Sequence, residues 1–249
     1  MWFDFPKPII IAHRGASAHA PENTLAAFEL AAQQGADAIE LDAKLSADGH
    51  AIVIHDETVD RTTDGHGRAT KMTLAALREL DAGGFFSERF RGERIPTLNE
   101  VFEAVGKKVL INVELTNYAT PCDDLVPKVV DLVKKHSLER RVLFSSFFPH
   151  NLRIACRLLP EVSRGLLAWA GWMGAWARTF GWRGPYQALH PYVTDLSAAL
   201  VQCVHAKERT VNVWTINNEK SLQRMLDFGV DGIFSDDPLL VCRALGRGK

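Results

Sequence analysis

Short apolar runs alternate with longer amphipathic segments along this chain, a pattern that predicts strands alternating with helices. The first two apolar runs cover residues 9–12 and 37–45. The segment 23–34 between them has helical periodicity and stops at Gly35. Since parallel strands need such a crossover between them, the chain is expected to open with a strand, a helix and a second, parallel strand.

The second predicted strand leads into a hairpin and then into a long irregular segment. Asp48 and Gly49 are typical of a two-residue turn, so we expect residues 51–54 to return antiparallel to the second strand. Residues 56–96 contain only one short helical pattern. We interpret them as an insertion after the second strand.

From residue 97 onward the alternation is regular. Thr97 and Glu100 have the spacing of a capping box at the start of a helix. Six more strands are predicted, and a helix follows each of them. The strands cover residues 109–115, 142–145, 164–168, 188–190, 211–216 and 232–234. Eight such units predict an α/β fold, a parallel (β/α)₈ TIM barrel that forms a single domain over residues 1–249.

Composition narrows the class of protein. A chain of 249 residues fits one α/β barrel or two small domains, and the eight units favour the barrel. The formal net charge of −1 gives no overall field that would attract nucleic acid. The four cysteines include no C-x-x-C pair, so we expect reduced thiols and no zinc site of that type. Residues 1–7 lack the pattern of a secretory signal, and we expect a cytoplasmic enzyme.

Several tryptophans gather after residue 165. The uncharged run 165–177 has 13 residues, fewer than the ~20 that span a bilayer, so we predict no transmembrane segment. Trp169, Trp172 and Trp176 fall on one helical face, which we expect to pack on the barrel. The alternative is an apolar lip beside the active site that makes weak contact with a membrane surface or admits an acyl chain.

Charged residues stand near the ends of the predicted strands. The first strand ends at His13 and Arg14, which places a proton carrier and a fixed cation where α/β barrels carry their active sites. Glu40 and Asp42 are two apart on the next strand and therefore point the same way. Buried carboxylates on one face repel each other, and either salt bridges to Arg14 or Lys44 or a divalent cation would relieve this.

A third carboxylate favours the cation. Glu114 lies near the end of the strand that follows the insertion, so it is expected beside Glu40 and Asp42. An all-oxygen set of ligands suits Mg²⁺ or Ca²⁺, and also Mn²⁺. From their spacing, these three residues either hold one divalent cation or form salt bridges to Arg14 or Lys44.

The hairpin brings a second histidine to the same place. With Ala47 opposite His50, His55 falls opposite Asp42, although a bulge would shift this register by one residue. Two histidines at one barrel mouth suit general acid–base catalysis near neutral pH, because one removes a proton while the other donates one. Together with a cation and an arginine, this chemistry suits phosphodiester cleavage.

These residues are part of a longer series of motifs, in which the chain resembles the bacterial glycerophosphodiester phosphodiesterases. The motifs run in order over nearly the whole chain: His13-Arg14-Gly15, Pro21-Glu22-Asn23-Thr24, Glu40-Leu41-Asp42, His55-Asp56, Asp60-Arg61-Thr62-Thr63, Ile95-Pro96-Thr97-Leu98, Ser145-Ser146-Phe147, Val213-Trp214-Thr215-Ile216-Asn217 and Ser235-Asp236-Asp237-Pro238.

The resemblance implies a barrel with a small insertion and metal-dependent hydrolysis of glycerophosphodiesters. The substrates would be small molecules such as glycerophosphocholine or glycerophosphoethanolamine, cleaved to sn-glycerol 3-phosphate and an alcohol. It implies that His13 and His55 are the general acid and base, and that Arg14 holds the phosphate. Phe147 and Trp214 would form apolar walls. The implied metal ligands are the three residues predicted above: Glu40, Asp42 and Glu114.

The chain departs from the family pattern at one position. Where the family commonly has a lysine two residues after the third carboxylate, this chain has Thr116, and Lys44 can compensate only if it faces the mouth. A lysophospholipase D that acts on membrane lipids with the same residues is an alternative function. A non-catalytic barrel is the third hypothesis, but it predicts loss of some of the catalytic or ligand residues, all of which are present.

Overall fold

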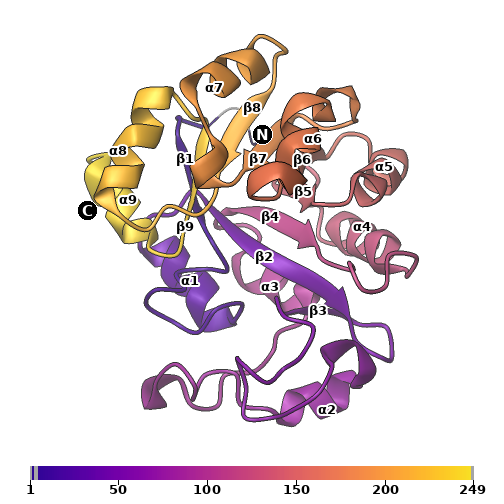
Figure 1. The fold of residues 1–249 in the computed structure, drawn as a ribbon. Coiled ribbons are helices and arrows are strands. Elements are labelled where there is room, and N and C mark those ends of the chain that lie inside the picture. Colours follow the sequence, from indigo (N-terminus) through magenta and orange to yellow (C-terminus); the bar gives the residue numbers. More distant parts are fainter. Residues whose placement is uncertain (1, 3–4, 248–249) are drawn as a thin grey trace.

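The computed structural model describes residue 2 and residues 5–247, without the side chain of Trp182. Five residues lie outside the described residues. They are residues 1, 3 and 4, within the start of the chain that we expect not to be a secretory signal, and residues 248 and 249 at the end of the predicted domain. Eight parallel strands close into a barrel (Figure 1): β1 (Ile9–Ala12), β2 (Ala38–Leu45), β4 (Leu110–Leu115), β5 (Val142–Ser146), β6 (Ser163–Ala168), β7 (Ala188–Pro191), β8 (Thr210–Val213) and β9 (Gly232–Ser235). The predicted TIM barrel is confirmed.

Helices cover the outside of the barrel, as Figure 1 shows. They are α1 (Leu25–Gln33), α3 (Leu98–Val105), α4 (Leu125–Lys135), α5 (Pro149–Leu158), α6 (Ala175–Thr179), α7 (Ala198–His205), α8 (Glu219–Phe228) and α9 (Pro238–Ala244). Their starts follow from local chemistry: the Thr97 hydroxyl accepts a hydrogen bond from the Glu100 amide, and the Glu100 carboxylate accepts one from the Thr97 amide.

Successive side chains of each strand point alternately to the inside and to the outside of the barrel. In β1, Ile9 and Ile11 pack with Phe234 and the fully buried Trp2 inside the barrel. Ile10 belongs to a cluster formed with the outer helices. The interior positions continue toward the carboxyl ends of the strands, where polar side chains replace the apolar ones. The apolar interior thus forms a floor beneath the site.

The register of the hairpin differs from the prediction by one residue. Leu45 lies opposite Ala51 at the end of β3 (Ala51–Val53), so the loop has three residues and ends at Gly49, whose φ is +78°. Ser46 and His50 extend the pairing, because the Ser46 amide donates to the His50 carbonyl at 2.9 Å. A three-residue loop with a left-handed third residue is a common hairpin connection.

As a result, the prediction that His55 faces Asp42 directly was wrong. The Ile54 amide, and not a His55 group, donates to the Asp42 carbonyl at 3.0 Å. The difference is one position along the strand, so His55 still leaves β3 at the mouth of the barrel.

The segment between β3 and α3 has a small core of its own. It contains α2 (Leu74–Glu79) and two single 3₁₀ turns. Ile52 and Ile54 turn away from the barrel and pack under this segment with a set of apolar residues: Val59, Ala69, Leu77, Ala82 and Ile95. The outer edge of β3 is bonded to the end of the same segment, because the Val53 amide donates to the Pro96 carbonyl at 2.9 Å.

The tryptophan-rich segment does not form one long helix. A 3₁₀ turn, Gly171–Gly174, precedes the five-residue α6. The expectation that its aromatic face packs on the barrel was wrong, since Trp169 is 40% exposed, Trp172 86% and Trp176 50%. Among residue 2 and residues 5–247, no helix has the length and apolar character that crossing a membrane requires.

Candidate active site

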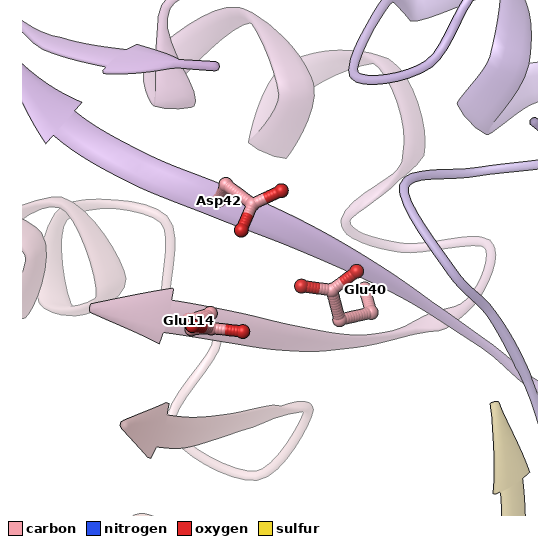
Figure 2. Close-up of side chains that lie close together, drawn as sticks. All are labelled: Glu40, Asp42 and Glu114. Atoms are coloured by element: carbon pink, nitrogen blue, oxygen red, sulfur yellow. The ribbon is translucent and has the colours of Figure 1, made fainter. Parts of the chain in front are cut away.

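Three carboxylates meet at the carboxyl end of the barrel strands. Asp42 on β2 lies directly beside Glu114 on β4, and Glu40 lies one interior position lower on β2. Figure 2 shows the three groups turned toward a common space. One oxygen of each lies within 4.8 Å of the others, which is close enough for a single ion to contact all three.

Burial and mutual repulsion make this cluster costly without a cation. Burial and the neighbouring Asp42 raise the pKa of Glu114 to about 8, and the same two causes raise the pKa of Glu40 well above its usual range. The Oε1 atom of Glu40 is buried with no hydrogen-bond partner within the described chain. An orphaned carboxylate oxygen in an all-oxygen cluster fits a divalent metal ion.

Arg14 neutralises part of the cluster. Its backbone amide donates to Glu40 Oε2 at 2.9 Å, and its Nε lies 3.5 Å from Asp42 Oδ2. Burial alone would raise the pKa of Asp42, but Arg14, aided by His55, lowers it below its usual value. The salt bridge to Arg14, which the sequence offered as the alternative to a cation, therefore exists for Asp42, but Glu40 Oε1 has no hydrogen-bond partner within the described chain.

Two neutral side chains fix the orientation of the carboxylates. The Asn23 amide donates to Asp42 Oδ2 at 2.8 Å, and the Tyr118 hydroxyl donates to Glu114 Oε1 at 2.8 Å. Each hydrogen bond engages one oxygen and leaves the carboxylate a second one that could contact an ion. Hydrogen-bond donors behind the ligands are what a preorganised metal site requires.

His13 is held by a carboxylate from the last strand. Its Nδ1 lies 2.7 Å from Asp236 Oδ1, just beyond β9. The side-chain amide of Asn217 and the Ser17 hydroxyl also donate to Asp236. Burial raises the pKa of Asp236, but His13, aided by Asn217 and Ser17, lowers it below its usual value. An imidazole fixed in this way presents its other nitrogen to the mouth.

His55 has a carboxylate partner of its own, in a chain of charges that reaches Arg14. Its Nδ1 lies 2.6 Å from Asp56 Oδ1, and Arg61 Nε donates to Asp56 Oδ2 at 2.7 Å. Arg61 also donates twice to Glu22, at 2.6 and 2.8 Å, and Glu22 accepts from Arg14 at 2.9 Å. His55 is thus linked through Asp56, Arg61 and Glu22 to Arg14 beside the carboxylate cluster.

An open cavity of about 400 Å³ lies on the His13 side of the cluster. It is lined by His13, Arg14, Ser17, Ala18, Glu22, Asn217, Asp236 and Asp237. A second cavity, of about 590 Å³, lies on the outer surface against α3 and α4, and none of the predicted site residues lines it. Only the first is placed to receive a reacting group.

Comparison with known proteins identifies the family. Residues 13–240 match the glycerophosphoryl diester phosphodiesterase family. A glycerophosphodiester phosphodiesterase of Caldanaerobacter subterraneus is 41% identical over 243 residues, which are 97% of this chain and 99% of that protein. The chain belongs to this family. It is therefore an enzyme, a phosphodiesterase.

Solved structures agree over nearly the whole chain. A phosphodiesterase of Oleispira antarctica, in complex with its product sn-glycerol-3-phosphate, is 34% identical with a TM-score of 0.86, and the match covers 96% of this chain and 97% of that one. The glycerophosphodiester phosphodiesterase of Agrobacterium tumefaciens is 31% identical with a TM-score of 0.79, covering 94% and 98%.

In this phosphodiesterase the predicted apolar residues lie together beside the mouth. The rings of Phe147 and Trp214 meet edge to face with centroids 5.7 Å apart. On its other side Phe147 stacks on Trp169, with centroids 3.7 Å apart and an interplanar angle of 15°. Trp169 was not among the predicted site residues, although it follows the end of β6 directly.

Thr116, which departs from the family pattern, is in contact with the positively charged side chain of Lys44. The Lys44 ammonium donates to the Thr116 hydroxyl at 3.0 Å and to its carbonyl at 3.2 Å. Lys44 is 2% exposed, and its burial lowers its pKa although Asp42 and Glu114 oppose this. The positive charge therefore stands behind the carboxylates and not on the surface of the cavity.

Several residues of the site carried no predicted role. Those that form the hydrogen bonds described above are Ser17, Glu22, Asn23, Asp56, Arg61, Tyr118, Asn217 and Asp236. All of them except Ser17 and Tyr118 stand within the family motifs of the sequence, which was the available signal.

Proposed function

We propose that this phosphodiesterase hydrolyses glycerophosphodiesters, such as glycerophosphocholine and glycerophosphoethanolamine, to sn-glycerol 3-phosphate and an alcohol. The observation that carries the proposal is the placement of His13 and His55, each with a carboxylate on Nδ1, around one cluster of acidic residues. The relative from Oleispira antarctica, whose structure contains sn-glycerol-3-phosphate, supports the choice of the glycerol side of the diester.

The two histidines would share the proton transfers. Asp236 and Asp56 each favour the imidazole tautomer that carries its proton on Nδ1, which leaves Nε2 to act on the substrate. One ring would remove the proton of the attacking group, and the other would protonate the oxygen of the departing alcohol. The attacking group is either water or the glycerol 2-hydroxyl, and in the second case water then opens the cyclic phosphate that forms.

Glu40, Asp42 and Glu114 would hold one divalent cation, Mg²⁺ or Ca²⁺, with Mn²⁺ as a third candidate. When bound, the ion supplies Lewis-acid polarisation of a phosphoryl oxygen. Arg14 lines the cavity and would bind the phosphate beside it. Phe147 and Trp214 would provide the apolar wall against which the carbon skeleton of the substrate rests.

Exchange of each histidine tests the assignment. His13→Asn and His55→Asn should each lower turnover of glycerophosphocholine by about 10²–10⁴-fold, because general acid–base catalysis contributes that much. A coupled assay for sn-glycerol 3-phosphate measures this, and circular dichroism checks the fold. His66→Asn is the matched control, since His66 also pairs with an aspartate, Asp60 at 3.2 Å, but is 86% exposed in the insertion. Near-normal turnover in either active-site variant contradicts the proposal.

The stack of Phe147 on Trp169 favours a second candidate, a lysophospholipase D activity, because it extends the apolar wall outward from the mouth. Release of choline from lysophosphatidylcholine by the purified enzyme would support it. Release from glycerophosphocholine alone would exclude it.

A further inference from the structure

A group of exposed apolar side chains lies beside the barrel mouth. We name it the aromatic rim, and it consists of Trp169, Trp172, Met173, Trp176 and Phe180. These are five of the eight large hydrophobic residues exposed within the described chain. The rim follows the carboxyl end of β6 directly, so it is on the same face of the barrel as the carboxylate cluster. Contiguous exposed apolar surface of this kind marks an interaction site.

The rim is held in a fixed shape by polar groups beneath it. The Arg178 guanidinium donates to the Trp169 carbonyl at 2.9 Å and to the Gly171 carbonyl at 2.5 Å. It also forms an ion pair with Asp195 at 2.9 Å, and Asp195 accepts from the Gly171 amide at 2.6 Å. The segment thus turns its polar groups inward and its aromatic rings outward, which preorganises an apolar surface.

The charge around the rim favours an anionic surface. Residues 162–194 contain no aspartate or glutamate and three arginines. One of them, Arg183, is exposed three residues after Phe180. Of the other two, Arg164 is buried and Arg178 is paired with Asp195. Tryptophan beside an exposed arginine is a composition that binds the boundary between lipid headgroups and acyl chains, because indole rings are amphipathic and arginine attracts anionic lipids. A protein partner would not require this lack of carboxylates.

The rim is continuous with the wall of the active site. Trp169 stacks on Phe147, and Phe147 meets Trp214 edge to face. Aromatic rings in contact therefore lead from Trp214 at the barrel mouth to Trp169, the first residue of the rim. A lipid surface on the rim would face the mouth of the barrel.

We propose that the aromatic rim docks this enzyme onto an anionic lipid surface, with the barrel mouth turned toward the headgroups. Trp172, Met173 and Trp176 insert between the lipids, while Arg183 meets the phosphate groups. The docking does not depend on the proposed chemistry, because it requires neither the histidines nor the cation. Its consequence is that diesters produced at a membrane are released within reach of the site.

Binding to vesicles tests this proposal. The full chain is sedimented with vesicles of phosphatidylcholine that contain phosphatidylglycerol, and with vesicles of phosphatidylcholine alone. We expect binding that is stronger with the anionic lipid and a blue shift of the tryptophan emission. The double variant Trp172→Ser/Trp176→Ser should bind at least about tenfold more weakly, since burial of one large side chain already contributes that much. Its turnover of soluble glycerophosphocholine should be unchanged.

Phe85→Ser/Phe86→Ser is the matched control. These two rings are 43% and 38% exposed, but they lie in the insertion between α2 and α3. This variant should bind vesicles like the unaltered chain. The proposal is overturned if the unaltered chain does not bind, or if both double variants bind equally well. It is also overturned if sedimentation equilibrium finds a dimer that the rim variant alone abolishes, because the rim would then bind a second copy. Loss of glycerophosphodiester turnover in the histidine variants is independent of all these outcomes.

Discussion

The two histidines that we propose as acid and base have the same kind of partner but different surroundings. His13 and Asp236 come from opposite ends of the chain and meet where β1 and β9 pair. His55 and Asp56 are adjacent in sequence and depend on Arg61 for their place. At the scale of single residues, the site is therefore built from one long-range pair and one local pair.

Loss of the carboxylate behind His13 should slow catalysis without weakening binding. Asp236→Asn keeps the size of the side chain but removes the charge that stabilises the protonated imidazole. We expect kcat to fall on the order of 10²-fold or more while KM changes little. Steady-state kinetics separate the two constants. Asp60→Asn, at the exposed His66 pair, should leave both unchanged, and an equal loss in both variants would argue against a positioning role.

His190 should make the stability of the fold dependent on pH. It is fully buried beside Phe234 and Asn212, and burial lowers its pKa to about 3. Since the unfolded chain binds this proton near pH 6.5, stability is complete above that pH and is lost as the pH falls toward 3. The loss reaches about 2 kcal/mol at pH 5. Urea unfolding of His190→Gln should show a flatter slope between pH 6.5 and 4.5, and equal slopes would refute the assignment.

The alternation of side chains along the strands was enough to predict that the three carboxylates lie together. It was not enough to predict the residues that form hydrogen bonds around the site. Glu40, Asp42 and Glu114 sit on neighbouring strands, so parity and strand order placed them together from sequence. Asp236 and Tyr118 stand after strands, where the chain direction is set by packing and not by periodicity. Their roles could not be derived from the spacing of residues.

At the scale of elements, the hairpin shows how a local preference misleads. Asp48-Gly49 is typical of a two-residue turn, yet the pairing of Ser46 with His50 and the left-handed Gly49 produce a three-residue loop. The sequence predicted the two strands correctly, and the loop changed the register by one. By contrast, the capping box at Thr97 was predicted from spacing alone, because both of its partners lie within four residues.

The capping box should contribute measurably to stability. Thr97→Ala removes the hydroxyl that caps α3 and should lower the free energy of unfolding by about 1 kcal/mol. Thr97→Ser keeps the hydroxyl and should lose only a fraction of this. Urea denaturation at neutral pH measures both. Equal losses would mean that the methyl group, and not the cap, is responsible.

At the scale of the whole molecule, the proposed cation would couple the stability of the fold to ion binding at the carboxylate cluster. Three buried acidic groups on β2 and β4 repel each other, so an ion that binds only the folded chain should stabilise the entire barrel. The melting temperature should rise with Mg²⁺ or Ca²⁺ concentration, and EDTA should reverse the rise. Glu114→Gln should abolish it. A melting temperature that is indifferent to both ions and to EDTA would exclude the proposed site.

The same binding should depend on pH. Because the pKa of Glu114 is about 8 without an ion, binding below that pH must displace a proton. Apparent affinity should therefore increase as the pH rises from 6 toward 8, with proton release measurable by calorimetry in buffers of different ionisation enthalpy. In Glu114→Gln this proton release should be reduced.

The two ends of the segment between β3 and α3 lie side by side, since the Val53 amide is bonded to the Pro96 carbonyl. A segment that leaves and re-enters a barrel at one point can be exchanged without moving the strands on either side of it. Residues 64–94 could be replaced by the corresponding stretch of a relative without changing the distance that the barrel must bridge. Such grafts would keep His55, Asp56 and Arg61 in place. The resulting chimaeras would differ in residues 64–94 and share the same reacting groups.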